Sequence, residues 1–531
     1  MTSPVWIPTV PHDQIPMNIY RAHVNKKFNQ DLRSSQELHH WSIRNLQDFW
    51  MDLHSYTGII PPLPPTITKA FDAKVPMENV PEFFRGATVN YAENVISGRD
   101  PTKTALVGIR EGHGLSGEVW TWGLLWENVR KARSALLQTG IQEGDRVAAI
   151  ISTSVWSVGL FLATASIGAI WTSIAPDLGD EGCISRLRQV KPSLLFADAE
   201  STYKGTMRSN VLKIQNIVKA IQVRPMVFLI PISGADEAKS KFDLSSLKMV
   251  QTGGSHLGKD QYHWFYRTFP LHVHLTSVTG GTDLVTSWIG TDPAGPVYPG
   301  EIQLPMLGQD VDVVDPITGE SIKHTGGHGE FVCRQPFPSM PVFFWGDEDG
   351  SKYKTTYFAK FPNFWAQHDW ASYNPHTMGW QIHGRSDGVL NPQGIRFGSS
   401  DIYSITESAL FNKVVSVTLC VGRRRSQDSD EAVFLFVVMQ ANQSFTSQIE
   451  YEIKNAIRKG LSSKHVPRFI IGVKEVPMTV NGKKIETLVK QVVSTGYLPK
   501  TISSTVANPE CLEHFRQYYN MEVVNKDRSR L

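Results

Sequence analysis

The sequence is short of cysteine and of excess charge, and each shortage excludes a class of protein. Its four cysteines, Cys183, Cys333, Cys420 and Cys511, lie far apart in 531 residues and form no Cys-x-x-Cys pair. This spacing argues against a disulfide framework and a zinc ribbon, and it indicates a reducing compartment. The formal net charge is only +3, so electrostatics give no reason to expect a nucleic acid partner.

The two ends of the chain differ in the targeting signals that they carry. The first residues have neither the basic nor the apolar region of a signal peptide. The last three, Ser529-Arg530-Leu531, are a close variant of the Ser-Lys-Leu peroxisomal address, which a receptor reads as a free tail. We therefore expect import into the peroxisome through the peroxisomal import receptor. The alternative is a chance basic tail on a cytoplasmic protein.

One uncharged stretch, residues 155–175, is long enough to cross a bilayer. Gly168 divides it into a helix-like part and a β-rich part, and five Ser and Thr residues dilute its hydrophobicity. A buried helix followed by a central parallel strand has the same uncharged signature. We therefore predict a helix and a strand here, not a transmembrane segment.

Strands and helices alternate around this stretch. A helix that Thr121 can cap precedes a strand at 146–152, and a strand at 193–197 follows a further helix. Alternation at this spacing indicates βαβ units and a parallel sheet. Residues 247–369 are richer in Gly, Pro and short strands.

A boundary is expected at the Gly- and Asp-rich sequence of residues 384–388, which has the composition of a hinge. Beyond it the pattern predicts a compact α+β unit with helices at 400–412, 446–461 and 484–493 and strands at 415–421, 432–438 and 468–473. The predicted fold class is α/β. A large N-terminal domain (1–384) combines parallel α/β layers with a β-rich part, and a smaller, mobile α+β domain (385–531) follows across a hinge.

Several apparent motifs do not indicate the binding sites that they resemble. Residues 112–117 match Gly-x-Gly-x-x-Gly literally, but a return strand follows them, which indicates a hairpin turn. Residues 252–259 place glycines after a strand and do not fit a Walker loop; they are either a plain turn or a close backbone approach to a flat ligand. His39-His40 and His272-x-His274 lack a third metal ligand, so we expect buried, satisfied or exposed histidines there.

Four features, taken together, indicate a functional site. Residues 279–283 (TGGTD) place a hydroxyl beside a carboxylate on a flexible turn, which suits phosphate and Mg²⁺. Asp369 is an acid among aromatic residues, where it can bind a ribose diol. Arg385 and Arg396 flank the expected hinge and are candidates for anionic oxygens. Lys483 lies at the tip of a predicted loop.

In this order, across nearly the whole chain, these features resemble the acyl-CoA synthetase superfamily of adenylate-forming enzymes. Four further segments, at 84–94, 300–303, 336–341 and 507–510, resemble its acetoacetyl-CoA synthetase branch. The resemblance implies an acid–thiol ligase that uses ATP, CoA and Mg²⁺. A short carboxylic acid, acetoacetate or a similar 3-oxo or branched acid, would become an acyl-adenylate and then a CoA thioester.

The resemblance also assigns roles to individual residues. Lys483 and Thr282 would be catalytic, Asp283 would hold the metal, Asp387 would be the hinge residue, and Gly280 would leave room in the acid pocket for more than two carbons. The residues that would bind the nucleotide are Gly253, Gly254, Ser255, Gly281, Asp369, Arg385 and Arg396.

One departure from the family is expected between residues 225–230 and 243–247. Family members carry a Ser/Thr/Gly-rich loop ending in Pro-Lys, which wraps the β- and γ-phosphates of ATP. Here only residues 231–242 join the two segments, so the N-terminal domain is shortened around 231–243. Each lost phosphate donor costs about 3 kcal/mol. The chain is therefore an active ligase, a pseudoenzyme that binds AMP or acyl-CoA, or a truncated or mis-spliced form of the ligase.

Overall fold

The computed structural model describes most of the chain, in segments. These are residues 3–109, 117–203, 206–221, 226–230, 247–253, 257–386, 390, 392, 397–428, 430–479, 482–499, 502 and 506–522. The shortened segment around 231–243 and the C-terminal Ser529-Arg530-Leu531 lie outside the described residues, and so do Gly254, Ser255, Asp387 and Arg396.

The predicted βαβ region forms a parallel sheet with the strand order β4-β3-β5-β8. Its strands are β3 (Arg146–Ile150), β4 (Ile170–Ile174), β5 (Leu194–Asp198) and β8 (Met226–Ile230). The helices are α5 (Trp122–Gln138), α6 (Val155–Ile167), α7 (Asp180–Val190) and α8 (Val211–Ala220). As predicted, Thr121 caps α5 by accepting from the amide of Leu124.

The uncharged stretch is the predicted helix and strand. Ser154 and Ser157 form a capping box at the start of α6, and Gly168 ends the helix with φ 80°. Strand β4 then pairs with β3. Among the described residues, no helix is both long enough and apolar enough to span a bilayer.

Further helices and two hairpins belong to the N-terminal part of the chain. The helices are α1 (Pro16–Phe28), α2 (Ser35–Arg44), α3 (Leu46–Tyr56) and α4 (Tyr91–Ile96). The hairpins are β1 (Thr104–Gly108) with β2 (Glu118–Thr121), and β6 (Glu200–Tyr203) with β7 (Thr206–Ser209). The antiparallel pairing of β1 with β2 confirms that the Gly-x-Gly-x-x-Gly match at 112–117 joins a hairpin.

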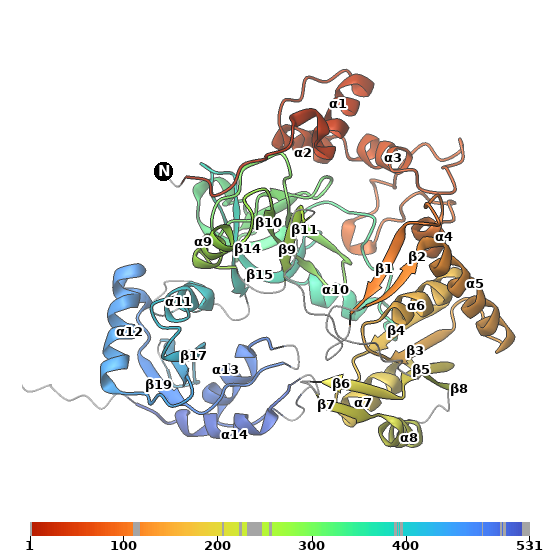
Figure 1. The fold of residues 1–531 in the computed structure, drawn as a ribbon. Coiled ribbons are helices and arrows are strands. Elements are labelled where there is room, and N and C mark those ends of the chain that lie inside the picture. The colour runs from red at the N-terminus through yellow and green to blue at the C-terminus, as the bar shows by residue number, and fades with distance from the viewer. Residues whose placement is uncertain are drawn as a thin grey trace, which may run out of the picture.

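The centre of the molecule consists of two four-stranded sheets (Figure 1). One has the order β12-β11-β10-β9, from β9 (Met249–Gly253), β10 (His274–Gly281), β11 (Thr286–Gly290) and β12 (Leu304–Pro305). The other is the antiparallel sheet of β13 (Val311–Val314), β14 (His328–Cys333), β15 (Trp365–Tyr373) and β16 (Trp380–Arg385). Helices α9 (Lys259–Thr268) and α10 (Ser351–Tyr357) accompany them. A core rich in aromatic residues, including the fully buried Trp288, Trp365 and Trp380, joins the two sheets.

The elements after β16 form the smaller α+β unit, drawn in blue at the lower left of Figure 1. Its sheet has the order β17-β18-β19, from β17 (Val415–Arg423), β18 (Ala432–Met439) and β19 (Phe469–Val473). Its helices are α11 (Ser399–Thr406), α12 (Ser447–Gly460), α13 (Glu486–Thr495) and α14 (Leu512–Phe515). Helix α11 ends earlier than the predicted 412. Glu407 leaves the helix and accepts from the backbone and hydroxyl of Thr418 at 2.7 and 2.8 Å.

Candidate active site

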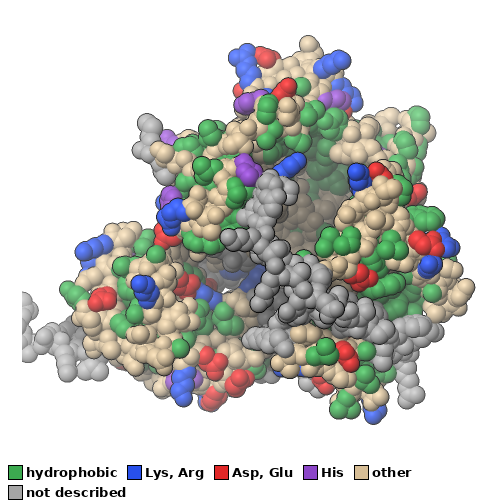
Figure 2. Space-filling view, in the orientation of Figure 1, with side chains coloured by type: hydrophobic (Ala, Val, Ile, Leu, Met, Phe, Trp, Pro, Cys, Tyr) green, Lys and Arg blue, Asp and Glu red, His purple; other side chains and the backbone are tan. Residues whose placement is uncertain are grey.

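A cleft of about 530 Å³ lies where the two central sheets meet the loop that carries Lys483. Seven of the residues predicted from the sequence line it: Gly280, Gly281, Thr282, Asp283, Asp369, Arg385 and Lys483. They come from three separate parts of the chain, which only the tertiary structure brings together. The space-filling view shows that this face of the molecule is hollowed between the central sheets and the α/β unit at the right (Figure 2).

The turn between β10 and β11 supplies the first group. Thr282 and Asp283 follow Gly281 directly, so a hydroxyl and a carboxylate stand side by side at one wall of the cleft. The Asp283 carboxylate accepts a hydrogen bond from the Tyr357 hydroxyl of α10. Burial and this hydrogen bond raise the pKa of Tyr357, so the phenol stays protonated and keeps donating.

Gly280 is glycine because the backbone of β11 leaves no space for a side chain. A Cβ at this position would lie 2.1 Å from the Thr286 carbonyl oxygen and 2.7 Å from the Ser287 Cα. The register between β10 and β11 shifts at Thr279/Gly280, which brings the two backbones this close. Backbone packing therefore accounts for the glycine. The effect of Gly280 on the size of the acid stays a prediction.

Strands β15 and β16 supply the second group. Asp369 pairs in register with Arg385, and their carboxylate and guanidinium lie 3.5 Å apart. Gln367 donates to the other oxygen of Asp369 at 2.7 Å, and Arg385 donates to the Gln367 carbonyl. Both side chains line the cleft, where a carboxylate suits hydroxyl groups and a guanidinium suits phosphate oxygens.

Lys483 supplies the third group. Its backbone amide donates to the Thr479 hydroxyl at 2.9 Å, and its carbonyl accepts from the Thr479 amide at 2.7 Å. Gly482, at φ 74°, makes the tight turn between them. Lys483 itself is exposed and lines the cleft.

The neighbouring lysine points the other way. Lys484 forms an ion pair with Glu407 at 2.6 Å and lies 3.3 Å from the centre of the Tyr403 ring. Burial lowers the pKa of Lys484, and the Glu407 carboxylate opposes that shift. Met478 and Lys484 form an isolated antiparallel bridge, so alternate side chains of this strand-like segment face the cleft and the interior of the smaller unit.

The sequence interpretation missed Tyr357, Gln367 and Lys484. Gln367 is the only one with a usable local signal, because it stands two residues before Asp369 on the same predicted strand. The contacts of Tyr357 with Asp283 and of Lys484 with Glu407 span 74 and 77 residues, so no local pattern encodes them.

Of the remaining predicted positions, the structure describes Gly253 and the histidine pairs. Gly253 ends β9 and pairs with Val278, a lining residue of the cleft. Of the histidine pairs, His39 is buried against the Gln309 carbonyl at 2.9 Å, and His274 stacks on Trp6 and bonds Gln303. These two histidines are satisfied by protein groups, as predicted.

Comparison with known proteins defines the class first. A family described as AMP-binding enzyme matches residues 96–231. The fold matches the acetoacetyl-CoA synthetase structure from Streptomyces lividans with a TM-score of 0.87 and 23% identity, over 97% of this chain and 99% of that one. An anthranilate CoA ligase structure matches with a TM-score of 0.60 and 14% identity, over 74% of this chain and 95% of that one. This is the two-domain fold of adenylate-forming enzymes.

Sequence relatives narrow the class. Acetoacetyl-CoA synthetase of Rattus norvegicus is 29% identical over 650 aligned residues, covering 94% of this chain and 95% of the relative. Malonamoyl-CoA synthetase of Penicillium aethiopicum is also 29% identical, covering 93% and 90%. The chain is an acetoacetyl-CoA synthetase-like member of the AMP-forming acyl-CoA synthetase superfamily, and by family an AMP-forming acid–thiol ligase.

The length of the alignment is relevant to the phosphate-binding loop that we expect to be missing around residues 231–243. The alignment with the Rattus norvegicus protein runs over 650 residues, whereas this chain has 531. The relatives therefore carry segments that have no counterpart in this chain. Strands β8 and β9 are the described elements on either side of the position where we predict the missing phosphate loop.

Proposed function

We propose that this chain activates a short acid with a carbonyl at carbon 3, such as acetoacetate, as an acyl-adenylate and transfers the acyl group to CoA. The names of two relatives, acetoacetyl-CoA synthetase and malonamoyl-CoA synthetase, support this substrate class, since acetoacetyl and malonamoyl groups both have such a carbonyl. The observation that carries the ligase chemistry is the convergence of a Thr–Asp turn, an Asp–Arg pair and a loop lysine on one cleft.

In the first half-reaction an oxygen of the acid carboxylate bonds to the α-phosphorus of ATP, and the bond from that phosphorus to pyrophosphate breaks. Two anions must approach each other, so fixed positive charge has to stand beside the phosphorus. Lys483 and Arg385 supply that charge at the cleft, with Arg385 oriented by Asp369. Thr282 donates its hydroxyl to a phosphate oxygen.

The nucleoside is held in the same cleft. Asp369 lines the cleft beside Gln367 and Arg385, and we propose that its carboxylate accepts from the ribose hydroxyls. We propose that Gly253, Gly254 and Ser255 contact the adenine, that Gly281 contacts the phosphates, and that Arg396 binds an anionic oxygen.

Mg²⁺ fits the donor set at the β10–β11 turn. It prefers one or two carboxylates completed by phosphate oxygens and water, and Asp283 stands next to Thr282 in that setting. Asp283 would hold the ion, which neutralises phosphate charge. Tyr357 orients the carboxylate through its hydrogen bond.

In the second half-reaction the CoA thiol displaces AMP from the acyl carbon. We propose that the smaller domain rotates about Asp387 between the two steps and withdraws Lys483 from the cleft. The exposed position of Lys483 on a tight loop permits this withdrawal without breaking core packing.

Isotope exchange between pyrophosphate and ATP tests the adenylation step. We expect exchange that depends on a short 3-oxo acid, is weaker with acetate, and falls about 10²–10³-fold in Lys483→Ala. Lys459→Ala, an exposed lysine on α12, is the matched control and keeps full exchange. Absence of exchange with every acid in a panel would reject the ligase proposal.

Calorimetry then separates the ligase from a pseudoenzyme. A ligase that still grips the β- and γ-phosphates binds ATP more tightly than AMP. Equal affinity for ATP and AMP, together with absent exchange, would favour the pseudoenzyme that the shortened segment around 231–243 suggests.

A further inference from the structure

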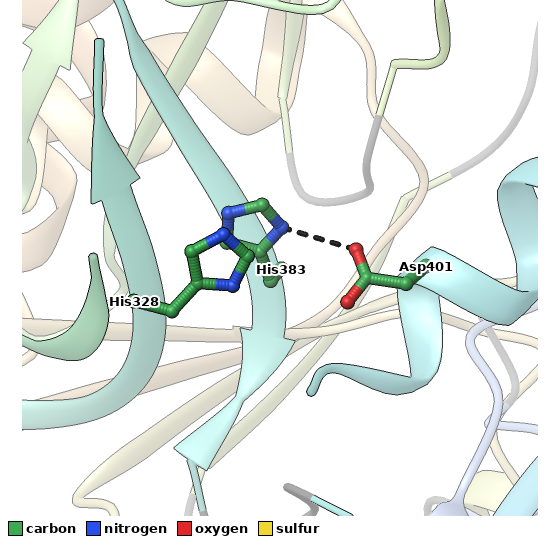
Figure 3. A group of neighbouring side chains, drawn as sticks. All are labelled: His328, His383 and Asp401. Atoms are coloured by element: carbon green, nitrogen blue, oxygen red, sulfur yellow. Dashed lines mark hydrogen bonds and ion pairs between the residues drawn. The ribbon is translucent and has the colours of Figure 1, made fainter. Parts of the chain in front are cut away.

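Three side chains with metal-ligand chemistry converge outside the cleft. His328 begins β14, His383 lies on β16, and Asp401 lies on α11. Their ligand atoms all lie within 4.8 Å of one another. The two imidazole rings stack with centroids 4.1 Å apart and an interplanar angle of 12°, and the Asp401 carboxylate faces their edge (Figure 3).

Contacts behind the cluster hold two of the three groups in place. The Ser372 hydroxyl lies 2.8 Å from His383 Nε2, which leaves Nδ1 facing Asp401 at 3.3 Å. One oxygen of Asp401 accepts from the Gly398 amide at 3.0 Å, and the other faces His383. Partners of this kind orient the ligands of metal sites, where the second nitrogen of a histidine is bonded to a protein group.

The cluster is also accessible. His383 is 7% exposed, whereas His328 is exposed to solvent and covers its outer face. His328 therefore lies on the solvent side of the cluster, and the inner two ligands are held by Ser372 and by the Gly398 amide.

The donor types select the class of ion. Two imidazoles and one carboxylate form a set that suits Zn²⁺ and similar borderline ions, with the fourth position left to water. Mg²⁺ and Ca²⁺ prefer oxygen ligands throughout. A hydrogen bond between His383 and Asp401 alone would explain those two residues, but it gives no role to the parallel ring of His328.

We propose that His328, His383 and Asp401 form a binding site for a borderline divalent ion such as Zn²⁺, and that the ion fastens α11 to β14 and β16. The two strands belong to the larger part of the chain and α11 to the smaller unit, so the bound ion would restrain their relative movement. An effect of the ion on turnover rests on the proposed rotation of the smaller domain, whereas binding of the ion is independent of that proposal.

Co²⁺ is a suitable probe because its visible absorption reports coordination by nitrogen and oxygen. We expect metal-free full-length protein to bind one equivalent with new visible bands, and Zn²⁺ to bleach them. His328→Asn should weaken binding at least about tenfold. His263→Asn, an exposed histidine on α9, is the matched control and should bind like the wild type.

His328 is exposed, so its replacement should leave the core intact. A second variant, in another ligand, tests the site independently. Asp401→Asn should also weaken Co²⁺ binding while its thermal unfolding curve stays cooperative. Unchanged bands in both His328→Asn and Asp401→Asn, or no saturable bands in the wild type, would overturn the site.

Hydrogen–deuterium exchange tests the fastening of α11. Zn²⁺ should slow exchange of the α11 amides in the wild type and leave them unchanged in His328→Asn. Neither measurement requires catalysis, so failure of the ligase proposal would leave both results interpretable. Slower exchange in both proteins alike would reject the assignment to this cluster.

Discussion

Replacing Gly280 by alanine separates two explanations for the glycine at the β10–β11 junction. The added Cβ would lie 2.1 Å from the Thr286 carbonyl oxygen and 2.7 Å from the Ser287 Cα. Ordinary contacts between such atoms are about 3.5 Å, so the strands would have to separate by about 1.4 Å at the closer contact. Both neighbours are backbone atoms, and no side-chain rotation can relieve the overlap.

The cost follows from that displacement. Overpacking of a well-packed site costs about 1–3 kcal/mol, and a ladder hydrogen bond stretched past its range costs about 1 kcal/mol more. We therefore expect Gly280→Ala to destabilise the protein by about 2–4 kcal/mol. Because Thr282 and Asp283 follow on the same turn, pyrophosphate exchange should fall for every acid alike.

Scanning fluorimetry and exchange with a series of two- to five-carbon acids measure both effects. Gly179→Ala is the matched control, since a Cβ there meets nothing within 4 Å, and its unfolding midpoint should stay within about 1 °C of the wild type. If Gly280→Ala keeps its midpoint and shifts preference toward acetate, pocket volume explains the glycine and the packing argument is refuted.

Four further predictions concern ionisable groups. Lys483→Ala should reduce exchange by about 10²–10³-fold without moving the unfolding midpoint, since this lysine is exposed. Lys484→Met should instead lower the midpoint, because it removes the ion pair with Glu407 from a largely buried position; identical behaviour of the two variants would contradict the division of roles. Asp369→Asn should weaken AMP binding about 10- to 100-fold in calorimetry, because hydrogen bonds to a charged acceptor are worth about 1.5–3 kcal/mol; unchanged affinity would remove Asp369 from the ribose site. Burial lowers the pKa of His39 to about 4 from 6.5, so the unfolded state binds its proton first. The contribution of neutral His39 to the free energy of unfolding is fully present above pH 6.5 and should be lost as the pH falls toward 4. We expect a loss of about 2 kcal/mol between pH 7 and 5. Urea titrations of His39→Gln should show a smaller decrease in the free energy of unfolding between pH 7 and 5. An equal decrease would contradict the assignment of this effect to His39.

The elements that local pattern governs could be predicted from the sequence. Helix α6 and strand β4 follow from Gly168 and the capping residues, and α12, β18 and β19 follow from their own periodicity within one or two residues. Helix α11 was predicted too long. The contact of Glu407 with Thr418, eleven residues away, competes with continuation of the helix.

The sequence by itself also determined the family, because its motifs occur in the order that adenylate-forming enzymes require. It named seven residues that line one cleft, yet it could not say that they meet there. Their convergence depends on register between strands and on packing between sheets, and such contacts have no local signature. The role of each of these residues stays a prediction.

Tertiary structure alone decided three further matters. Gly280 is required by the approach of β11. The consecutive lysines 483 and 484 face opposite surroundings. His328, His383 and Asp401 form a cluster that no spacing in the sequence indicated. In each case the deciding partner is distant along the chain, and only the folded backbone sets the distance between them.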